Sequence, residues 1–216
     1  VGDNALTAVS LAFPIQTLII AVAVGTGVGL NSLISRRLGE QNYEAANSAA
    51  SHGPFLGICS WLVFAVFGLF FSRTFFEAFT ETAQVIEMGT QYISIVTIFS
   101  FGSFVQINFE KILQATGNMF YPMLFQLVGA VTNIILDPIF IFGYFGFPKM
   151  GVAGAAVATV AGQILAMVFS VYVAFRKNHA VTIQIKGFRP QKAVIQEIYA
   201  VGLPSIVMQS IGSVLV

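Results

Sequence analysis

Five stretches of this chain are each long and apolar enough to cross a lipid bilayer as a helix. A bilayer core about 30 Å thick needs roughly 20 helical residues, because each residue of an α-helix advances about 1.5 Å. The stretches that meet this requirement are residues 6–34, 49–71, 86–113, 120–145 and 152–175, and a sixth apolar run begins near Ile198. We therefore expect an all-α fold, a polytopic bundle of transmembrane helices.

The shortage of charged side chains supports the same interpretation. Only 9% of the 216 residues are charged, whereas a soluble globular domain usually carries about 25%. Lipid is therefore the expected solvent for most of the surface, and we expect a multi-pass membrane protein. The net charge of +1 gives no electrostatic reason to expect a nucleic-acid partner.

Basic residues between the apolar stretches predict the orientation in the membrane. Lys and Arg in short loops stay on the cytoplasmic side. When successive loops are assigned to alternate sides, eight basic residues fall on one side and two on the other. The larger group is Arg36, Arg37, Lys111, Arg176, Lys177, Lys186, Arg189 and Lys192, and the smaller group is Arg73 and Lys149. We therefore expect the chain to begin outside the cell.

The segments between the spans are predicted to be loops. They are residues 36–47, 72–84, 114–121, 143–151 and 176–197, and the last of these is the most basic. The spacing of Val194, Ile195 and Ile198 is typical of a short amphipathic helix within that last loop. Because the sequence has no initiator Met and its last residues are apolar, we expect a fragment of a longer protein.

Asp137 is the acidic residue that lies well inside a predicted span, where a buried charge is costly and usually marks function. Asn133 comes four residues earlier and so lies on the same helix face. Pro138 removes a backbone donor and frees the carbonyl of Ile134. Interrupted helices with freed carbonyls commonly coordinate cations in transporters.

Thr159 is expected at a similar depth in the next span. A carboxylate, an amide oxygen and a hydroxyl at one depth suit Na⁺. The same carboxylate, once desolvated, can instead carry a proton. The structural alternative is that Asp137 caps a kinked helix or forms local hydrogen bonds.

Other polar side chains within the spans have two possible structural roles. Each can face a central substrate cavity or join helices by hydrogen bonds, and they are Gln16, Gln106, Asn108, Gln126 and Gln163. Glu110 and Lys111, near the cytoplasmic end of the third span, are expected to reach the interface or pair with neighbours. The glycines at positions 25–29 are expected to allow close helix packing. We find no nucleophile, metal or phosphate-loop constellation, and therefore expect neither an enzyme nor a cofactor.

Several of these segments together resemble the multidrug and toxic compound extrusion (MATE) transporters. The most specific part is the sequence from Asn133 to Pro138 followed by that from Gly151 to Thr159. Supporting similarity is found at residues 2–9, 35–39, 114–118 with Pro122 and Met123, and 201–204. The resemblance covers essentially the whole chain.

This resemblance implies a parent transporter of twelve helices in two six-helix lobes. Residues 1–175 would form helices two to six of the N-terminal lobe, residues 176–197 a cytoplasmic inter-lobe loop, and residues 198–216 the start of the second lobe. Members export organic cations and amphipathic drugs in exchange for Na⁺ or H⁺, without a cofactor, and the full-length protein is expected to be a monomer. By resemblance to the family's ion site, Asn133, Asp137 and Thr159 are implied to bind the coupling ion, and Tyr92 is the candidate for a further member of the same network. The family's acidic residue on its first helix has no counterpart here.

Two other functions are consistent with a helical membrane bundle. A lipid-linked oligosaccharide flippase would need basic residues in its cavity to bind a pyrophosphate, but nearly all of the basic residues here lie in predicted loops. A purely structural bundle would leave Asp137 without a purpose. Drug efflux is therefore the favoured hypothesis.

Overall fold

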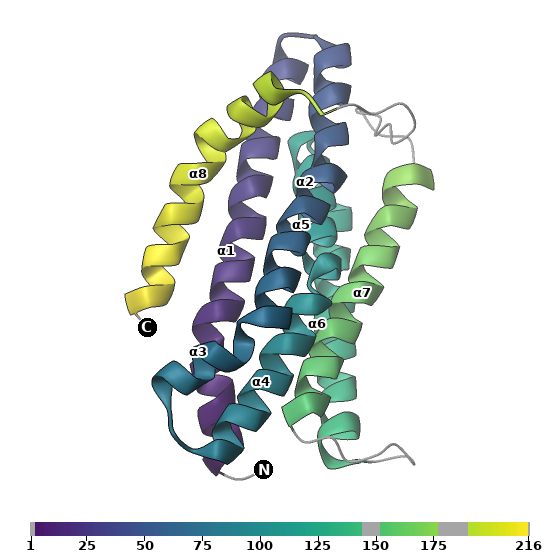
Figure 1. Ribbon diagram of the computed structural model, residues 1–216. Helices are drawn as coiled ribbons and strands as arrows, with labels where there is room; N and C mark the ends of the chain where they lie inside the picture. Colours follow the sequence, from purple (N-terminus) through teal and green to yellow (C-terminus); the bar gives the residue numbers. More distant parts are fainter. Residues whose placement is uncertain (1–2, 144–151, 177–189, 216) are drawn as a thin grey trace.

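The computed structural model describes residues 3–143, 152–176 and 190–215, which form eight helices and no strand. The helices are α1 (Asp3–Gly39), α2 (Tyr43–Phe70), α3 (Ser72–Phe79), α4 (Ala83–Ile98), α5 (Phe101–Ala115), α6 (Phe120–Phe142), α7 (Val152–Arg176) and α8 (Lys192–Leu215). The long helices run side by side as a bundle, and short α3 lies near its lower end in Figure 1. The predicted all-α transmembrane bundle is confirmed.

Five of the described helices are long and apolar enough to cross a membrane on their own. Four of them, α1, α2, α6 and α7, correspond to the predicted spans that begin at residues 6, 49, 120 and 152, and α2 ends one residue before its predicted span does. The fifth is α8, which corresponds to the sixth apolar run. Helix α6 ends at Phe142 and is capped by Gly143 in the left-handed conformation, and residues 144 and 145 of the predicted span lie outside the described residues.

The third predicted span is not one straight helix, because α4 and α5 meet at an angle of 43°. Three side chains donate hydrogen bonds to backbone carbonyls at or near this point. The Ser100 hydroxyl donates to the carbonyl of Thr97 at 2.8 Å, and the Trp61 indole N–H donates to the carbonyl of Ile98 at 2.6 Å. The Thr97 hydroxyl donates to the carbonyl of Ile93 at 2.7 Å. Side chains that insert into the backbone ladder are a common cause of such bends.

Helix α3 occupies part of a segment that was predicted to be a loop, so that prediction is wrong for residues 72–79. Its aromatic residues explain the difference. Phe76 is fully buried and its ring lies where a Cβ on Gly89 of α4 would be. The phenylalanine ring anchors the segment to the bundle, while the exposed pair Arg73–Glu77 (3.0 Å) faces away.

Helix α8 begins at Lys192, earlier than the apolar run that starts near Ile198. The amphipathic segment and the apolar run form one continuous helix rather than two. Ile198 is fully buried against Leu30 and Leu33 of α1, and Glu197 pairs with Arg37 at 2.7 Å. These contacts dock the first turns of α8 on the end of α1.

The described basic residues follow the predicted asymmetry. Arg36 and Arg37 lie in the last turn of α1 and Lys192 in the first turn of α8, and these helix ends meet at the upper end of the bundle in Figure 1. Arg73 lies on α3, near the opposite end. Lys149, Lys177, Lys186 and Arg189 lie outside the described residues, as does the side chain of Arg176.

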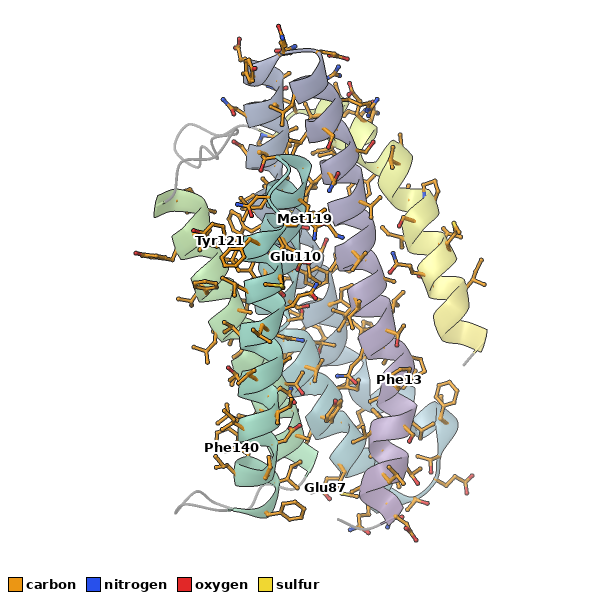
Figure 2. All side chains as sticks on the ribbon, turned by 180° about the vertical axis from the view of Figure 1, so that it is seen from behind. Phe13, Glu87, Glu110, Met119, Tyr121 and Phe140 are labelled. Atoms are coloured by element: carbon orange, nitrogen blue, oxygen red, sulfur yellow. The ribbon has the colours of Figure 1, made fainter. Side chains whose placement is uncertain are left out.

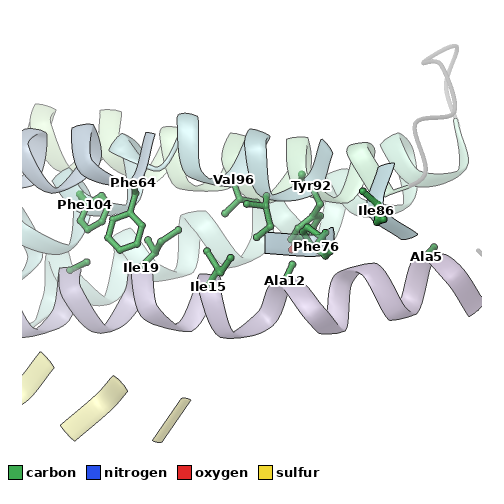
Figure 3. Packing of buried hydrophobic residues seen from close by; sticks show 13 residues of the cluster. Ala5, Ala12, Ile15, Ile19, Phe64, Phe76, Ile86, Tyr92, Val96 and Phe104 are labelled. Carbon is green, nitrogen blue, oxygen red and sulfur yellow. The ribbon is translucent and has the colours of Figure 1, made fainter. Parts of the chain in front are cut away.

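One face of α1 supplies much of the largest core cluster. Ala5, Ala12, Ile15 and Ile19 recur at helical spacing and pack against aromatic side chains of α2, α3, α4 and α5 (Figure 3). Because lipid tails are as apolar as these side chains, close packing rather than water exclusion holds such a cluster together.

Glycines set the closest approach between α1 and α8. A Cβ on Gly202 of α8 would lie 2.7 Å from the carbonyl oxygen of Gly25 on α1, and a Cβ on Gly29 would collide with the backbone of Ile198. The predicted role of the glycines at positions 25–29 in close helix packing is confirmed at Gly25 and Gly29.

Candidate ion-binding site and polar cavity

Glycines also allow α6 and α7 to pack closely where the two helices cross. A Cβ on Gly162 of α7 would lie 2.7 Å from the carbonyl oxygen of Gly129 on α6, and a Cβ on Gly154 would lie 2.5 Å from that of Phe140. Backbones can approach this closely only where side chains are absent. The crossing therefore fixes the separation of polar residues placed one turn from the glycines.

Asn133 and Thr159 were predicted to lie at a similar depth in neighbouring spans, and their side chains meet across this crossing. The Asn133 amide Nδ2 donates to the Thr159 hydroxyl oxygen at 3.1 Å, and that hydroxyl donates its own proton to the carbonyl of Ala155 at 3.0 Å. Among the described residues no group donates a hydrogen bond to the side-chain oxygen of Asn133, Oδ1. That oxygen and a lone pair of the Thr159 hydroxyl therefore remain available as ligands of a hard cation.

Asp137 lies one turn beyond Asn133 on the same face of α6 and is half-buried. It is five residues from the last residue of α6, or about 8 Å along the helix axis. None of the side chains in the described part of the chain donates a hydrogen bond to its carboxylate. The structure therefore gives Asp137 no capping role within the described residues, and both carboxylate oxygens remain available.

Tyr92 approaches the same site from α4 and is buried. Its hydroxyl interacts with the side chain of Gln16 on α1 and lies within the electrostatic field of Asp137. Helices α1, α4, α6 and α7 thus contribute the four residues suggested by the family resemblance, together with Gln16. Two of the four are joined directly by a hydrogen bond, and Tyr92 and Asp137 are linked through their electrostatic interaction.

Three of the five amides for which a substrate cavity was one interpretation line a shared pocket. A cavity of about 460 Å³ extends from Asn133 and Thr159 to Gln163, Gln106 and Gln126, with Phe125 and Ile134 as apolar walls. The Gln163 Oε1 atom is buried without a hydrogen-bond partner among the described residues. Polar groups left unpaired beside a cavity are the usual place for a ligand or water to bind.

The other two candidates lie apart from this cavity. Asn108 is 1% exposed and its Nδ2 donates to the carbonyl of Gly53 on α2 at 2.8 Å, which is a helix-joining bond. Gln16 contacts Tyr92 instead. Of the five amides, Gln106, Gln126 and Gln163 therefore line the cavity.

Glu110 is more deeply buried than its place near the end of a span suggested, with 3% of its surface exposed. Of the two expectations, pairing with neighbours is the one observed. Gln106 and Gln126 both donate to its carboxylate, at 2.8 and 2.7 Å. The four-residue spacing of Gln106, Glu110 and Gln114 was the available sequence signal, because it places all three on one helix face.

Comparison with known proteins relates the whole chain to transporters. The MatE family model matches residues 1–139. The Multidrug export protein MepA of Staphylococcus haemolyticus is 30% identical over 209 residues, which is 96% of this chain and 45% of that protein. The protein of the same name from Staphylococcus aureus (strain MRSA252) is 28% identical over 208 residues, again covering 45% of its length. The chain thus spans about half the length of these curated relatives.

Solved transporter structures share the fold. The inward-facing conformation of a multidrug resistance MATE family transporter superposes with a TM-score of 0.91 at 32% identity, covering 99% of this chain and 48% of the other. The outward-facing conformation of such a transporter gives a TM-score of 0.89 at 31% identity, with 97% and 46% covered. The fold of this chain therefore resembles half of a transporter in both states.

Proposed function

This chain belongs to the MatE family, and from that premise we propose that it forms part of a secondary transporter that exports drugs in exchange for Na⁺ or H⁺. The relatives named as multidrug export proteins support drugs as the substrate class. Organic cations and amphipathic compounds suit a cavity with both amide and apolar walls. The proposed setting is the plasma membrane of a bacterial or archaeal cell, with a monomeric transporter.

The lobe assignment follows the same premise. Helices α1 to α7 would form most of the N-terminal lobe, and α8 would open the second lobe. The similar TM-scores of 0.91 and 0.89 against inward- and outward-facing structures support a unit that keeps its fold while the transporter changes state. Transport by alternating access would then move this unit as a body against the other lobe.

The ion-coupling proposal is supported by the Asn133–Thr159 hydrogen bond one helical turn from the Asp137 carboxylate, which has no hydrogen-bond donor within residues 3–143, 152–176 and 190–215. A carboxylate at membrane depth is costly unless it has a ligand. Three oxygen donors on α6 and α7 suit Na⁺, and the carboxylate alone suffices for H⁺. Binding drives transport only if the ion prefers one conformation over the other, and closure around Asp137 would provide that preference.

The test is Asp137→Asn, expressed from the native gene in cells that lack their own multidrug exporters. The variant keeps the side-chain shape but removes the charge, so we expect normal membrane insertion and efflux no higher than in cells without the transporter. Na⁺ and H⁺ gradients imposed separately on membrane vesicles would identify the coupling ion. Normal ion-driven efflux by this variant would refute the assignment.

Glu87→Gln is the matched control. Glu87 is an exposed carboxylate on α4, near the same end of the bundle (Figure 2). The substitution makes the same chemical change outside the site, and we expect efflux to be unaffected. A loss equal to that of Asp137→Asn would mean that surface charge, rather than the site, limits transport.

A further inference from the structure

A second carboxylate is buried in the membrane-spanning part of the bundle. Glu110 lies on α5 behind α6, toward the end of the bundle opposite Glu87 (Figure 2). It is far from Asp137, because its hydrogen-bond partner Gln126 precedes Asp137 by eleven residues, or about 16 Å, along α6. Burial of such a group needs either a compensating cation or a means of neutralising the carboxylate.

The groups around Glu110 are amides. Oε1 accepts from Gln126 Nε2 at 2.7 Å and from Gln114 Nε2 at 3.4 Å. Oε2 accepts a single hydrogen bond, from Gln106 Nε2 at 2.8 Å. The amides stabilise the ionised carboxylate by hydrogen bonding but do not neutralise its charge.

The positive charge that acts on Glu110 is that of its neighbour Lys111. Lys111 Nζ donates to Gln114 Oε1 at 3.3 Å, so an amide separates it from the carboxylate in this chain of hydrogen bonds. The helices packed against α5 also carry ionisable groups: Asp3, Arg36 and Arg37 on α1, Tyr43, Glu44, His52 and Cys59 on α2, Tyr121 and Asp137 on α6, and Tyr172 on α7. The hydrogen bonds to the Glu110 carboxylate in the described part of the chain come instead from the three amides.

The two oxygens of Glu110 are not equivalent toward a proton. Each carboxylate oxygen has two lone pairs, and both lone pairs of Oε1 already accept N–H donors, so a proton on Oε1 would displace one of them. Oε2 accepts only from Gln106, so a proton can bind its remaining lone pair, and Gln106 can turn its amide and present its own Oε1 as the acceptor. Gln106 lines the polar cavity, so it has space beside it in which to turn. In the same cavity, Gln163 Oε1 lacks a partner among the described residues and can receive a turned N–H₂ group or a water molecule.

We propose that Glu110 is a proton-binding site separate from Asp137, that the proton binds Oε2, and that Gln106 is the side chain that responds. The reaction converts a carboxylate and a proton into a carboxylic acid, and no other bond is formed or broken. When the proton is bound, the carboxyl O–H donates to Gln106 Oε1, and the Gln106 N–H₂ group turns toward the cavity. Protonation of Glu110 would thereby change the orientation of Gln106, which lines the same cavity as Asn133 and Thr159.

Infrared difference spectroscopy tests the proposal on the full-length transporter in liposomes. Changing the pH should produce the carbonyl stretching band of a protonated carboxylic acid that persists in Asp137→Asn and disappears in Glu110→Gln. A pH-dependent spectrum unchanged by Glu110→Gln would overturn the proposal. Because this band is measured without drug or ion gradient, the result does not depend on whether Asp137 couples transport.

A pair of glutamine variants tests the role of Oε2 and remains informative if Glu110→Gln does not fold. Gln106→Met keeps a similar shape but removes both the donor to the ionised Oε2 and the acceptor of the protonated Oε2. Because a hydrogen bond to a charged group is the stronger of the two, the proton affinity measured from the band should rise, by up to about tenfold. Gln114→Met is the comparison variant: it removes the long 3.4 Å bond to Oε1 and also the amide that separates Lys111 from the carboxylate, so the proton affinity should change much less, or fall as Lys111 approaches. Equal effects of the two variants, or none from Gln106→Met, would refute the assignment to Oε2.

Discussion

The crossing of α6 and α7 provides a quantitative prediction, because one added methyl group should disturb the candidate ion site by forcing the two helices apart. In Gly162→Ala the new Cβ would lie 2.7 Å from the Gly129 carbonyl oxygen, whereas ordinary contact begins at 3.4 Å. The helices must therefore separate locally by about 0.7 Å. The distance between Asn133 Nδ2 and Thr159 Oγ1 is 3.1 Å. If it increases by the same amount, it becomes about 3.8 Å, which is too long for a hydrogen bond.

The reciprocal variant is a built-in control. In Gly129→Ala the new Cβ would lie 3.5 Å from the Gly162 carbonyl oxygen, which is ordinary contact. Both substitutions gain about 1 kcal/mol from the better helix propensity of Ala, so this contribution cancels in the comparison. Overpacking costs about 1–3 kcal/mol, and we therefore expect Gly162→Ala to be less stable than Gly129→Ala by about that amount.

Two measurements on the full-length protein in lipid nanodiscs check this expectation. Thermal unfolding should give a lower midpoint for Gly162→Ala than for Gly129→Ala. Ion-driven efflux in cells should weaken in Gly162→Ala, because Asn133 and Thr159 no longer meet, and should be retained in Gly129→Ala. Equal midpoints and equal efflux in the two variants would show that the glycine crossing does not set the geometry of the site.

Two further substitutions test the contacts that shape the bundle. Trp61→Phe leaves the carbonyl of Ile98 without its indole donor at the α4–α5 bend, so the free energy of unfolding should fall by about 1 kcal/mol; an unchanged unfolding curve would show that this bond does not stabilise the bend. Arg37→Ala removes the ion pairs with Glu197 on α8 and with Glu40, and should lower the unfolding midpoint only slightly, with a still smaller shift from Arg73→Ala in its exposed pair. A double-mutant cycle with Glu197→Ala isolates the contact between α1 and α8, and a shift from Arg37→Ala as large as that from Trp61→Phe would contradict this expectation.

The sequence by itself determined the membrane fold and the order of the spans. Apolar length is a local property, since every backbone group in lipid must find its partner within a helix. The residues of the α6–α7 site were also predictable, because Asn133 and Asp137 share a helix face by their spacing. A family resemblance carried by Asn133, Asp137 and Thr159 then placed the hydroxyl beside the amide, as observed.

Only the tertiary structure decided features that depend on contacts between distant segments. The α4–α5 bend involves Trp61 from another helix, and α3 is anchored by Phe76 in the space left by Gly89. The burial of Glu110 depends on Gln126, sixteen residues away on α6. Hydropathy treats each span alone, so it cannot show which buried carboxylate will meet hydrogen-bond donors from a neighbouring helix, and that meeting determines whether a charge can stay inside the bundle.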